Sequence, residues 1–293
     1  MKKHTTIAVD IAKNVYEVAV SEGPGRVKER RRLSRGQMRR FLASRSPSRV
    51  VMEACGTAHA LGRELQGYGH EAVLLPPGQV RRYVLRNKTD RTDTKGLLEA
   101  DRNEEIVPVP VKTEGQQALV AVHRMRSGWK ATRTARLNAI RGLLREFGIA
   151  VPVGATRVLP ALREAMAAGR VPGTLEGMLL SAAAEVRELE ARTAEAEETL
   201  KRMAAELGAA ERLQTVPGIG LLTATALIGS VGEPGRFRSG RKLASFLGLV
   251  PREHSSGERR RLGSITKRGD TYVRMLLTHG ARSVLRAASR RKT

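Results

Sequence analysis

Short apolar segments with strand character alternate with helical segments over the first hundred or so residues, and this alternation restricts the fold to an α/β class. The runs TTIAVDI, NVYEVAV and VKERRRL predict a meander of three antiparallel strands. A helix across RGQMRRFLASR, a strand at RVVMEA, a helix over residues 57–69 and a strand at HEAVLLPP follow. This order predicts an RNase H-like layer whose later strands lie parallel to the first.

Acidic residues end two of these strands. Asp10 closes the first and Glu53 closes the fourth, and the carboxyl ends of strands are where an open α/β sheet usually builds its site. We expect these two strands to be neighbours. Asp90 and Asp93 follow in NKTDRTDTK, three residues apart on one helix face, with Thr89 as the cap. Four such carboxylates suit Mg²⁺ or Mn²⁺, and paired metals can clamp both oxygens of a phosphodiester displacement.

The D-x-x-D pair has a second interpretation, because an acid in a first helical turn often only complements the helix dipole. The two strand-end acids favour the metal site. The basic residues around the pair then become predicted phosphate contacts, although each also suits a solvated face. They are Lys88, Arg91 and Lys95.

The charge of the chain calls for a polyanionic partner. Its 53 Lys and Arg residues outnumber 29 Asp and Glu residues, for a formal charge of +24. Nucleic acid is the natural partner, and aromatic residues at 3% are too scarce for rows of base-stacking rings. No apolar run approaches the roughly 20 residues of a membrane span, and the first residues lack the core of a signal peptide. We therefore expect a soluble, cytoplasmic protein with no membrane partner. The single cysteine, Cys55, is expected to be a small buried filler.

Two long helices are predicted in the middle of the chain. Residues 113–147 carry an apolar stripe at Val122, Met125, Trp129, Thr132, Ile140, Leu143 and Phe147. The other faces carry Arg124, Arg126, Lys130, Arg133, Arg136, Arg141 and Arg145, which suit phosphate contacts. Residues 179–207 show a heptad seam with Glu-rich exposed positions, which predicts a coiled-coil arm. Its partner is either the first long helix or the same arm of another subunit.

The last third of the chain carries two local motifs. The string VPGIG, between helical segments, suits a helix-hairpin-helix module in which the N–H groups of Gly218 and Gly220 bind a phosphate; an ordinary tight turn is the alternative. The loop PREHSSGERRRLGSITKRGD then surrounds two serines with cations, before a final helix from about residue 271. By composition alone Ser255 and Ser256 are turn residues beside a glycine. The cations expected to contact nucleic acid there are Arg259, Arg260, Lys267 and Arg268.

Taken together, the motifs AVDIAKN, MEACGTAH, KTDRTD, VPGIG and FLGLVPREHSSGERRRLGSITKRGD resemble the insertion sequence 110 family of transposases over nearly the whole chain. The resemblance implies an α/β RuvC-like DEDD domain at residues 1–112, a helical coiled-coil region at 113–207, and an all-α C-terminal domain with a helix-hairpin-helix module and the serine loop at 208–293. It implies a recombinase directed by a structured bridge RNA that pairs with donor and target DNA.

The resemblance also assigns residues. Asp10, Glu53, Asp90 and Asp93 match the DEDD acids and would hold the divalent metal. The family's nucleophilic serine precedes a glycine, which points to Ser256, with Ser255 as an unresolved neighbour. Attack on double-stranded DNA would leave a phosphoserine and a free 3′ hydroxyl. In the family the serine and the acids meet between subunits, which implies a homo-oligomer, a dimer or tetramer. Thr94 departs from the alanine that the family commonly has there, a change expected to affect packing more than ligation.

Two other functions fit part of the sequence. A metal-dependent, RuvC-like junction nuclease would use water instead of serine. A non-enzymatic architectural protein would bind DNA or RNA with the hairpin and the basic helices, but it gives no reason for four acids in a chain that binds polyanions, since acids near phosphates cost affinity unless a cation lies between them.

Overall fold

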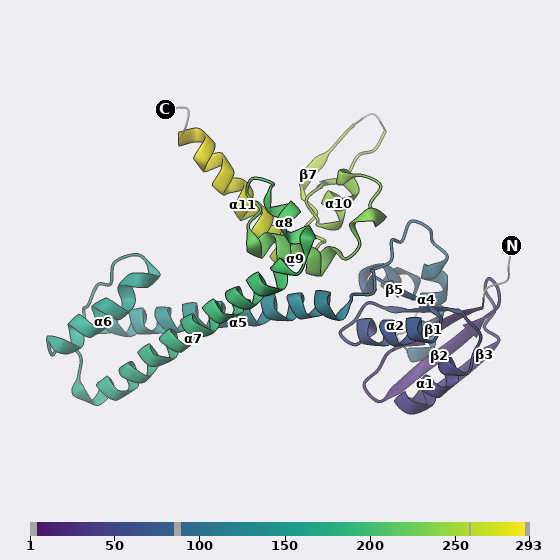
Figure 1. Cartoon of the computed structure of the whole chain (residues 1–293), viewed down its shortest axis with the longest axis horizontal. Coiled ribbons are helices and arrows are strands. Elements are labelled where there is room, and N and C mark those ends of the chain that lie inside the picture. The colour runs from purple at the N-terminus through teal and green to yellow at the C-terminus, as the bar shows by residue number, and fades with distance from the viewer. Residues whose placement is uncertain (1–4, 85–88, 258, 291–293) are drawn as a thin grey trace. The chain divides into compact units, whose positions relative to one another are not determined.

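The computed structural model of the chain describes residues 5–84, 89–257 and 259–290. The chain divides into two compact units, residues 1–115 and 116–293. The first is a mixed α/β unit and the second is largely helical (Figure 1). The long central helices and the C-terminal helices, which the sequence predicts as separate regions, share the second unit.

A five-stranded sheet forms the centre of the first unit. Its strands are β1 (Thr6–Asp10), β2 (Val15–Ser21), β3 (Glu29–Ser34), β4 (Arg49–Glu53) and β5 (Glu71–Leu75). Their order in the sheet is β3-β2-β1-β4-β5. β1 to β3 are antiparallel neighbours, whereas β4 and β5 lie parallel to β1. The predicted meander and the parallel strands are therefore confirmed.

Helices cover both faces of this sheet. They are α1 (Arg35–Ala43), α2 (Ala58–Gly67), α3 (Pro77–Val80), the 3₁₀ turn η1 (Arg81–Tyr83) and α4 (Asp90–Asp101). Met38 of α1 and Leu65 of α2 pack with Val9 on one face. Leu97 of α4 packs with Ala8 on the other. Successive residues of a strand point to opposite faces, so β1 contributes to both cores and the sheet lies between two helical layers.

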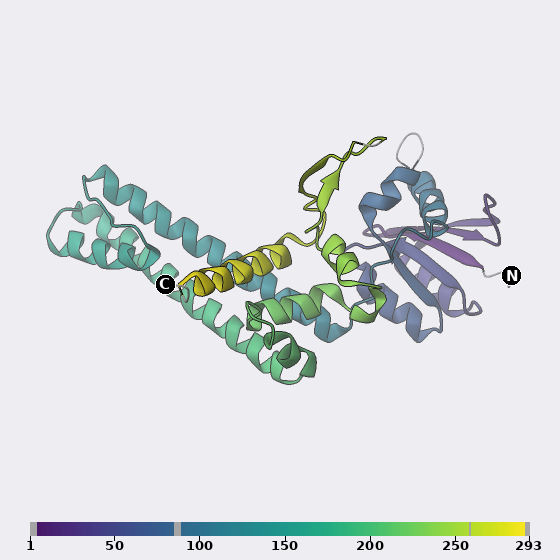
Figure 2. The same cartoon turned by 90° about the horizontal axis from the view of Figure 1, so that it is seen from above.

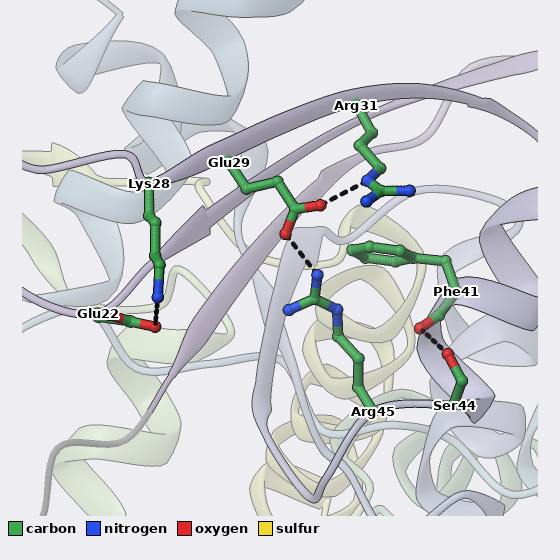
Figure 3. A network of polar contacts seen from close by, with 7 residues as sticks. All are labelled: Glu22, Lys28, Glu29, Arg31, Phe41, Ser44 and Arg45. Atoms are coloured by element: carbon green, nitrogen blue, oxygen red, sulfur yellow. Dashed lines mark hydrogen bonds and ion pairs between the residues drawn. The ribbon is translucent and has the colours of Figure 1, made fainter.

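The exposed edge of the sheet, β3, is lined by charged groups (Figure 3). Glu29 accepts hydrogen bonds from Arg31 and Arg45, and both guanidinium groups lie over the ring of Phe41, at 5.2 Å and 4.2 Å from its centroid. Burial alone would raise the pKa of Glu29, but the bonds from the two arginines outweigh it and lower the pKa. Such charges on an edge strand disfavour pairing with another strand.

Two 33-residue helices dominate the second unit, α5 (Glu114–Glu146) and α7 (Gly173–Ala205). They run antiparallel side by side (Figures 1 and 2). Ion pairs join Arg126 to Glu197 and Arg136 to Glu185 along their length. The partner of the acidic helix within this chain is thus the basic helix, one of the two possibilities that the sequence left open.

The buried face of α5 differs from the predicted stripe. Of the predicted positions, Ile140 is buried, whereas Met125 is 54% exposed and Thr132 is also exposed. The buried positions are Leu119, His123, Arg126, Leu137, Ile140 and Leu144. The predicted helix is confirmed, but its inner face carries a His and an Arg. Both can be buried there because groups on other helices form hydrogen bonds with them. Arg126, predicted on a phosphate-contacting face, is buried.

Several elements lie outside the predictions: the short helix α3, the 3₁₀ turns and two larger features. α6 (Val158–Ala167) lies in the Gly- and Pro-punctuated stretch after the 3₁₀ turn η2 (Ala155–Arg157), and its Leu162 packs with Ile140 and Val186. A two-stranded sheet of β6 (Pro251–Glu253) and β7 (Leu262–Ile265) forms in the serine loop. The C-terminal region is therefore not all-α. Polar and basic side chains hid this hairpin, because both strands are largely exposed and lack alternation.

The remaining elements of the second unit pack together around a separate core. They are α8 (Gly208–Gln214), α9 (Leu221–Val231), η3 (Pro234–Arg236), α10 (Gly240–Phe246) and α11 (Thr271–Arg290). Leu227 of α9, Leu247 after α10 and Val273 of α11 form their common core. The predicted VPGIG hairpin joins α8 to α9, and the predicted final helix begins at Thr271. No helix among the described residues has the length and apolar character that crossing a membrane requires.

Candidate functional site

The two strand-end acids lie side by side. The parallel register pairs Val9 of β1 with Met52 of β4, so Asp10 and Glu53 occupy the next position along neighbouring strands. Both are partly buried. Ala8, two residues before Asp10, belongs to the core that α4 covers, so both carboxylates lie on that face of the sheet. The expectation that these acids end neighbouring strands is confirmed.

The other two acids occupy the first turn of α4. Asp90 is exposed and Asp93 is partly buried. Thr89 caps the helix, accepting from the Thr92 N–H at 3.2 Å, while its own N–H donates to the Thr92 hydroxyl at 2.9 Å. This reciprocal cap fixes the start of the helix, as predicted. α4 packs on the sheet face that carries Asp10.

Contacts from two partly buried arginines hold α4 at both ends. At its start, Arg30 of β3 donates to the Thr94 hydroxyl at 3.0 Å and to the Arg91 carbonyl at 3.3 Å. Burial lowers the pKa of Arg30, and the charge of Arg91 lowers it further. At its end, Arg49 of β4 binds Asp101 through two nitrogens, at 2.8 to 3.1 Å, and this contact raises the pKa of Arg49. These distant contacts could not be read from the local sequence.

The donor set suits a hard divalent cation, since all four predicted ligands are carboxylates. Within the described residues, no three or more His, Cys, Asp or Glu side chains stand close enough to hold one ion together. Of the predicted phosphate contacts, Arg91 and Lys95 are exposed on α4, and Lys88 lies outside the described residues. Cys55, expected to be buried, is exposed.

The serine loop is a hairpin with Ser256 near its tip. His254 N–H donates to the Arg261 carbonyl at 2.9 Å, and the backbones of Ser256 and Arg259 exchange hydrogen bonds of 3.3 Å and 3.2 Å. Gly257 follows with a φ of +55°, a conformation that glycine adopts without strain. Ser256 is exposed. The hairpin thus displays this residue at its outer end.

The two serines of the hairpin differ in their contacts. The Ser255 hydroxyl donates to Glu253 at 2.7 Å and accepts from the Arg261 N–H at 3.1 Å. Among the described residues, the hydrogen bonds of Ser256 are those of its backbone. Ser255 therefore contributes to the hairpin structure, a role that the two adjacent serines of the sequence could not distinguish.

At the base of the hairpin, the backbone before β6 lies directly against the backbone after β7, a contact that we call the glycine crossing. A Cβ on Gly248 would lie 2.6 Å from the Arg268 nitrogen, and one on Gly269 would lie 2.3 Å from the Phe246 carbonyl oxygen. Lys267, at a φ of +56°, donates its N–H to the Gly248 carbonyl. The buried guanidinium of Arg274 donates to the carbonyls of Leu247 and Gly269, both at 3.1 Å. The buried Arg274 of α11 therefore binds both of the backbone segments that meet at the glycine crossing.

The serine loop carries four cations that the sequence predicts to contact nucleic acid. Arg259, Arg260, Lys267 and Arg268 are all exposed. Arg260 lies 3.6 Å from the Glu253 carboxylate, in a surface ion pair. An exposed pair of this kind contributes little to stability, which leaves the arginine available to a stronger anion.

The helical hairpin is in tight contact with α11. Gly218 has a φ of +86°, and a Cβ there would lie 2.8 Å from the Gly280 carbonyl oxygen. Gly220 is exposed and caps α9. α9 and α11 also border an open cavity of about 390 Å³. Its lining residues are Glu197, Gly220, Leu221, Leu222, Thr223, Leu276, His279 and Gly280.

A buried histidine connects three helices of the second unit. His123 of α5 contacts the Tyr272 hydroxyl of α11 at 3.0 Å and the Thr225 hydroxyl of α9 at 2.9 Å. Burial, and secondarily the nearby charge of Arg126, lower its pKa to about 4. No local sequence pattern predicts this cluster, because Tyr272 and Thr225 lie 149 and 102 residues from His123 along the chain.

Comparison with known proteins gives a consistent result over both units. Residues 7–149 match the DEDD transposases of IS110 elements, and residues 210–293 match the IS116/IS110/IS902 transposase family. The chain is 41% identical over 286 residues to a probable family 20 transposase of Pseudomonas aeruginosa, which covers 97% of the chain and 85% of that relative.

Two further relatives are insertion-sequence transposases. The chain is 38% identical to the transposase for IS1111A of Coxiella burnetii, over 98% of the chain and 79% of the relative. It is 35% identical to the transposase for IS1328 of Yersinia enterocolitica, over 96% of the chain and 84% of that relative. With the strand-end acids, the capped D-x-x-D helix and the serine hairpin in place, these matches establish that the chain belongs to the IS110 family of insertion-sequence transposases.

Proposed function

We propose that this transposase cuts and rejoins double-stranded DNA through a covalent bond to Ser256. Assistance would come from a divalent metal, Mg²⁺ or Mn²⁺, which would have to draw Asp10, Glu53, Asp90 and Asp93 together, since no three acids of the described residues stand close enough to share an ion. The observation that carries the proposal is the difference between the two serines. The hydroxyl of Ser255 is engaged inside the hairpin, whereas Ser256 is presented at an exposed tip between arginines.

The chemistry is a pair of phosphoryl transfers. The Ser256 Oγ forms a bond to phosphorus and loses its proton, while the bond from phosphorus to the 3′ oxygen breaks and that oxygen leaves as a protonated hydroxyl. The 3′ hydroxyl of the other duplex then attacks the phosphoserine, and the proton returns to Ser256. Positive charge near the hydroxyl favours its ionised form, so the exposed cations of the hairpin support its role as nucleophile.

The carboxylates have a separate role. When bound, a divalent metal would neutralise charge that develops on the phosphate oxygens. Asp10 and Glu53 are fixed by the strands that they end, and the threonine cap fixes the turn of Asp90 and Asp93. The acids and the serine lie in different units, which is compatible with a site assembled from two subunits of a dimer or tetramer.

We further propose that a structured guide RNA specifies the DNA sites. The charge of +24 supports binding of more than one polyanion, and the scarcity of aromatic side chains favours recognition of nucleic-acid backbones over stacking on single strands. In this arrangement base pairing by the RNA supplies the sequence specificity, and the protein supplies charge and chemistry.

The serine proposal is tested with Ser256→Ala and the matched control Ser255→Ala. DNA carrying an element end is incubated with protein, guide RNA and Mg²⁺, then denatured and analysed for protein-linked DNA. Ser256→Ala should abolish both cleavage and the adduct. Ser255→Ala should retain both at a reduced rate, because it loosens the hairpin without removing the nucleophile.

Other outcomes identify the alternatives. Cleavage by Ser256→Ala without an adduct would indicate hydrolysis by water in a metal-dependent nuclease. If Asp10→Asn left every function of the protein intact, the acid would have no catalytic role. That result would indicate an architectural protein instead of a metal-assisted enzyme.

A further inference from the structure

The C-terminal half of α11 carries a row of arginines on one side. Arg282, Arg286 and Arg290 are spaced four residues apart, and residues 281–290 are all exposed. Side chains at this spacing lie above one another on a helix, about 6 Å apart along its axis. The whole helix has no acidic residue, and none of the ion pairs between described residues involves these three arginines. We call them the α11 arginine row.

The row continues from the cavity beside the helical hairpin. His279 precedes Arg282 by three residues, so it projects from the same side of α11. It is exposed and lines the cavity together with Gly220 and Leu221, at the start of α9. The first N–H groups of a helix carry partial positive charge. Glu197, which also lines the cavity, is paired with Arg126, so the groups suited to phosphates run from the start of α9 along α11.

The position of this line is fixed relative to the serine hairpin, within the same unit. Arg274 binds the carbonyls of Leu247 and Gly269 at the base of the hairpin, and α11 touches the helical hairpin where Gly280 meets Gly218. A side chain cannot fit between these two glycines. The helix that bears the row is thus anchored in its first half at two points, and its second half extends without buried residues.

We propose that the α11 arginine row binds the phosphate backbone of the DNA duplex that the serine hairpin cuts. Charge complementarity supports this occupant, since three unneutralised cations with regular spacing match the repeating charge of a nucleic-acid strand. A second copy of the chain is the competing occupant, because Leu285 is 69% exposed beside the row. A two-fold interface through this part of α11 would place the arginine rows of both copies against each other. Repulsion between the like charges disfavours that dimer.

The test compares two triple variants with the same change in charge. One is Arg282→Gln, Arg286→Gln and Arg290→Gln; the control is Arg163→Gln, Arg170→Gln and Arg187→Gln, exposed cations elsewhere in the same unit. Both are made in Ser256→Ala protein, and affinity for a DNA duplex is measured from low to high KCl. Measuring binding without cleavage keeps failure of this inference distinguishable from failure of the serine chemistry. The identity of the bound duplex as the one that is cut rests on the proposed function.

Each lost phosphate contact lowers the slope of log affinity against log salt by about 0.9. Relative to the Ser256→Ala parent, we expect the magnitude of this slope to fall by about 2 to 3 in the α11 variant and by less than about 1 in the control. Equal slopes for the two variants would overturn the proposal. It would also be overturned if the α11 variant weakened binding to structured RNA alone, or if Leu285→Ser lowered the mass of DNA-free protein in light scattering. Circular dichroism checks that the variants are folded.

Discussion

Two polar side chains, His123 and Arg126, are buried on the inner face of α5, where a helix usually carries apolar residues. His123 is 4% exposed and contacts two hydroxyl groups, and Arg126 one turn later is 6% exposed. Burial of the imidazole lowers its pKa, and the charge of the neighbouring Arg126 lowers it further, so His123 is held neutral. The neutral form of His123 is therefore part of the folded state at neutral pH.

This histidine should make the second unit less stable in acid. Its pKa is about 4 when folded and near 6.5 when unfolded. Between these values the unfolded chain binds a proton that the folded chain does not, so the free energy of unfolding falls as the pH drops from about 6.5 to about 4. The loss should be on the order of 1 to 3 kcal/mol. Urea unfolding followed by Trp129, the only tryptophan in the chain, measures it.

The control separates this residue from other titrating groups. His123→Gln should flatten the pH dependence in that range, whatever its effect on overall stability. His279→Gln, which changes an exposed histidine, should leave the dependence unchanged. An unchanged slope in His123→Gln would show that other groups cause the acid sensitivity.

Thr94 shows how far one residue could be understood from the sequence. Its departure from the family's usual alanine was expected to affect packing, and it is fully buried. The sequence could not show that its hydroxyl accepts a hydrogen bond from Arg30, 64 positions away on an edge strand. Contacts of this range depend on the folded sheet, which local patterns do not encode.

Along α5 and α7, opposite charges pair helix to helix. Arg133 bonds Glu190 at 2.7 Å, between the pairs of Arg126 and Arg136. Arginines predicted to face phosphates are thus partly neutralised by the acidic helix. The period and charge of both helices, and the bounds of α5 to within one residue, are predictable from the sequence because they are local properties. The start of α7 at Gly173, six residues before the predicted seam, and the buried face of α5, which depends on the partner helix, are not.

Removing the acid of the innermost pair should destabilise this helical pair. The Arg126 side chain is 7% exposed and Glu197 is 45% exposed. Glu197→Gln leaves a buried cation without its counter-charge, and we expect a loss of about 1 to 2 kcal/mol in the free energy of unfolding, reduced from a fully buried case by the exposure of the glutamate.

A matched variant is available on the same helix. Glu188→Gln breaks a surface pair with Arg192 and should cost less than about 0.5 kcal/mol. Both are measured by urea unfolding at neutral pH. Equal losses would show that burial of Arg126 does not strengthen its pair.

For the chain as a whole, charge is distributed unevenly. Acidic side chains gather on α7, opposite the arginines of α5, and at the sheet face beside α4, whereas α11 has none and the hairpin has few. The net charge of +24 therefore falls mainly on surfaces away from the helical pair. Self-repulsion of this excess is relieved when a polyanion binds.

Affinity for nucleic acid should consequently depend steeply on salt and weakly on sequence in the protein alone. Between about 50 and 200 mM KCl we expect the affinity for a random duplex to fall by roughly 10³-fold or more, because bound phosphates release their counterions. Fluorescence anisotropy with labelled duplexes of unrelated sequence measures this. A complex insensitive to salt would contradict a binding mode based on charge.

The glycine crossing at the base of the serine hairpin makes that hairpin an exchangeable module. Gly248 and Gly269 bring two backbone segments into direct contact, and everything between β6 and β7 lies beyond this point. Changes in the length or composition of the tip can accumulate without disturbing the helices below, while either glycine tolerates no side chain. Hairpins transplanted between relatives with both glycines intact should therefore fold on the recipient.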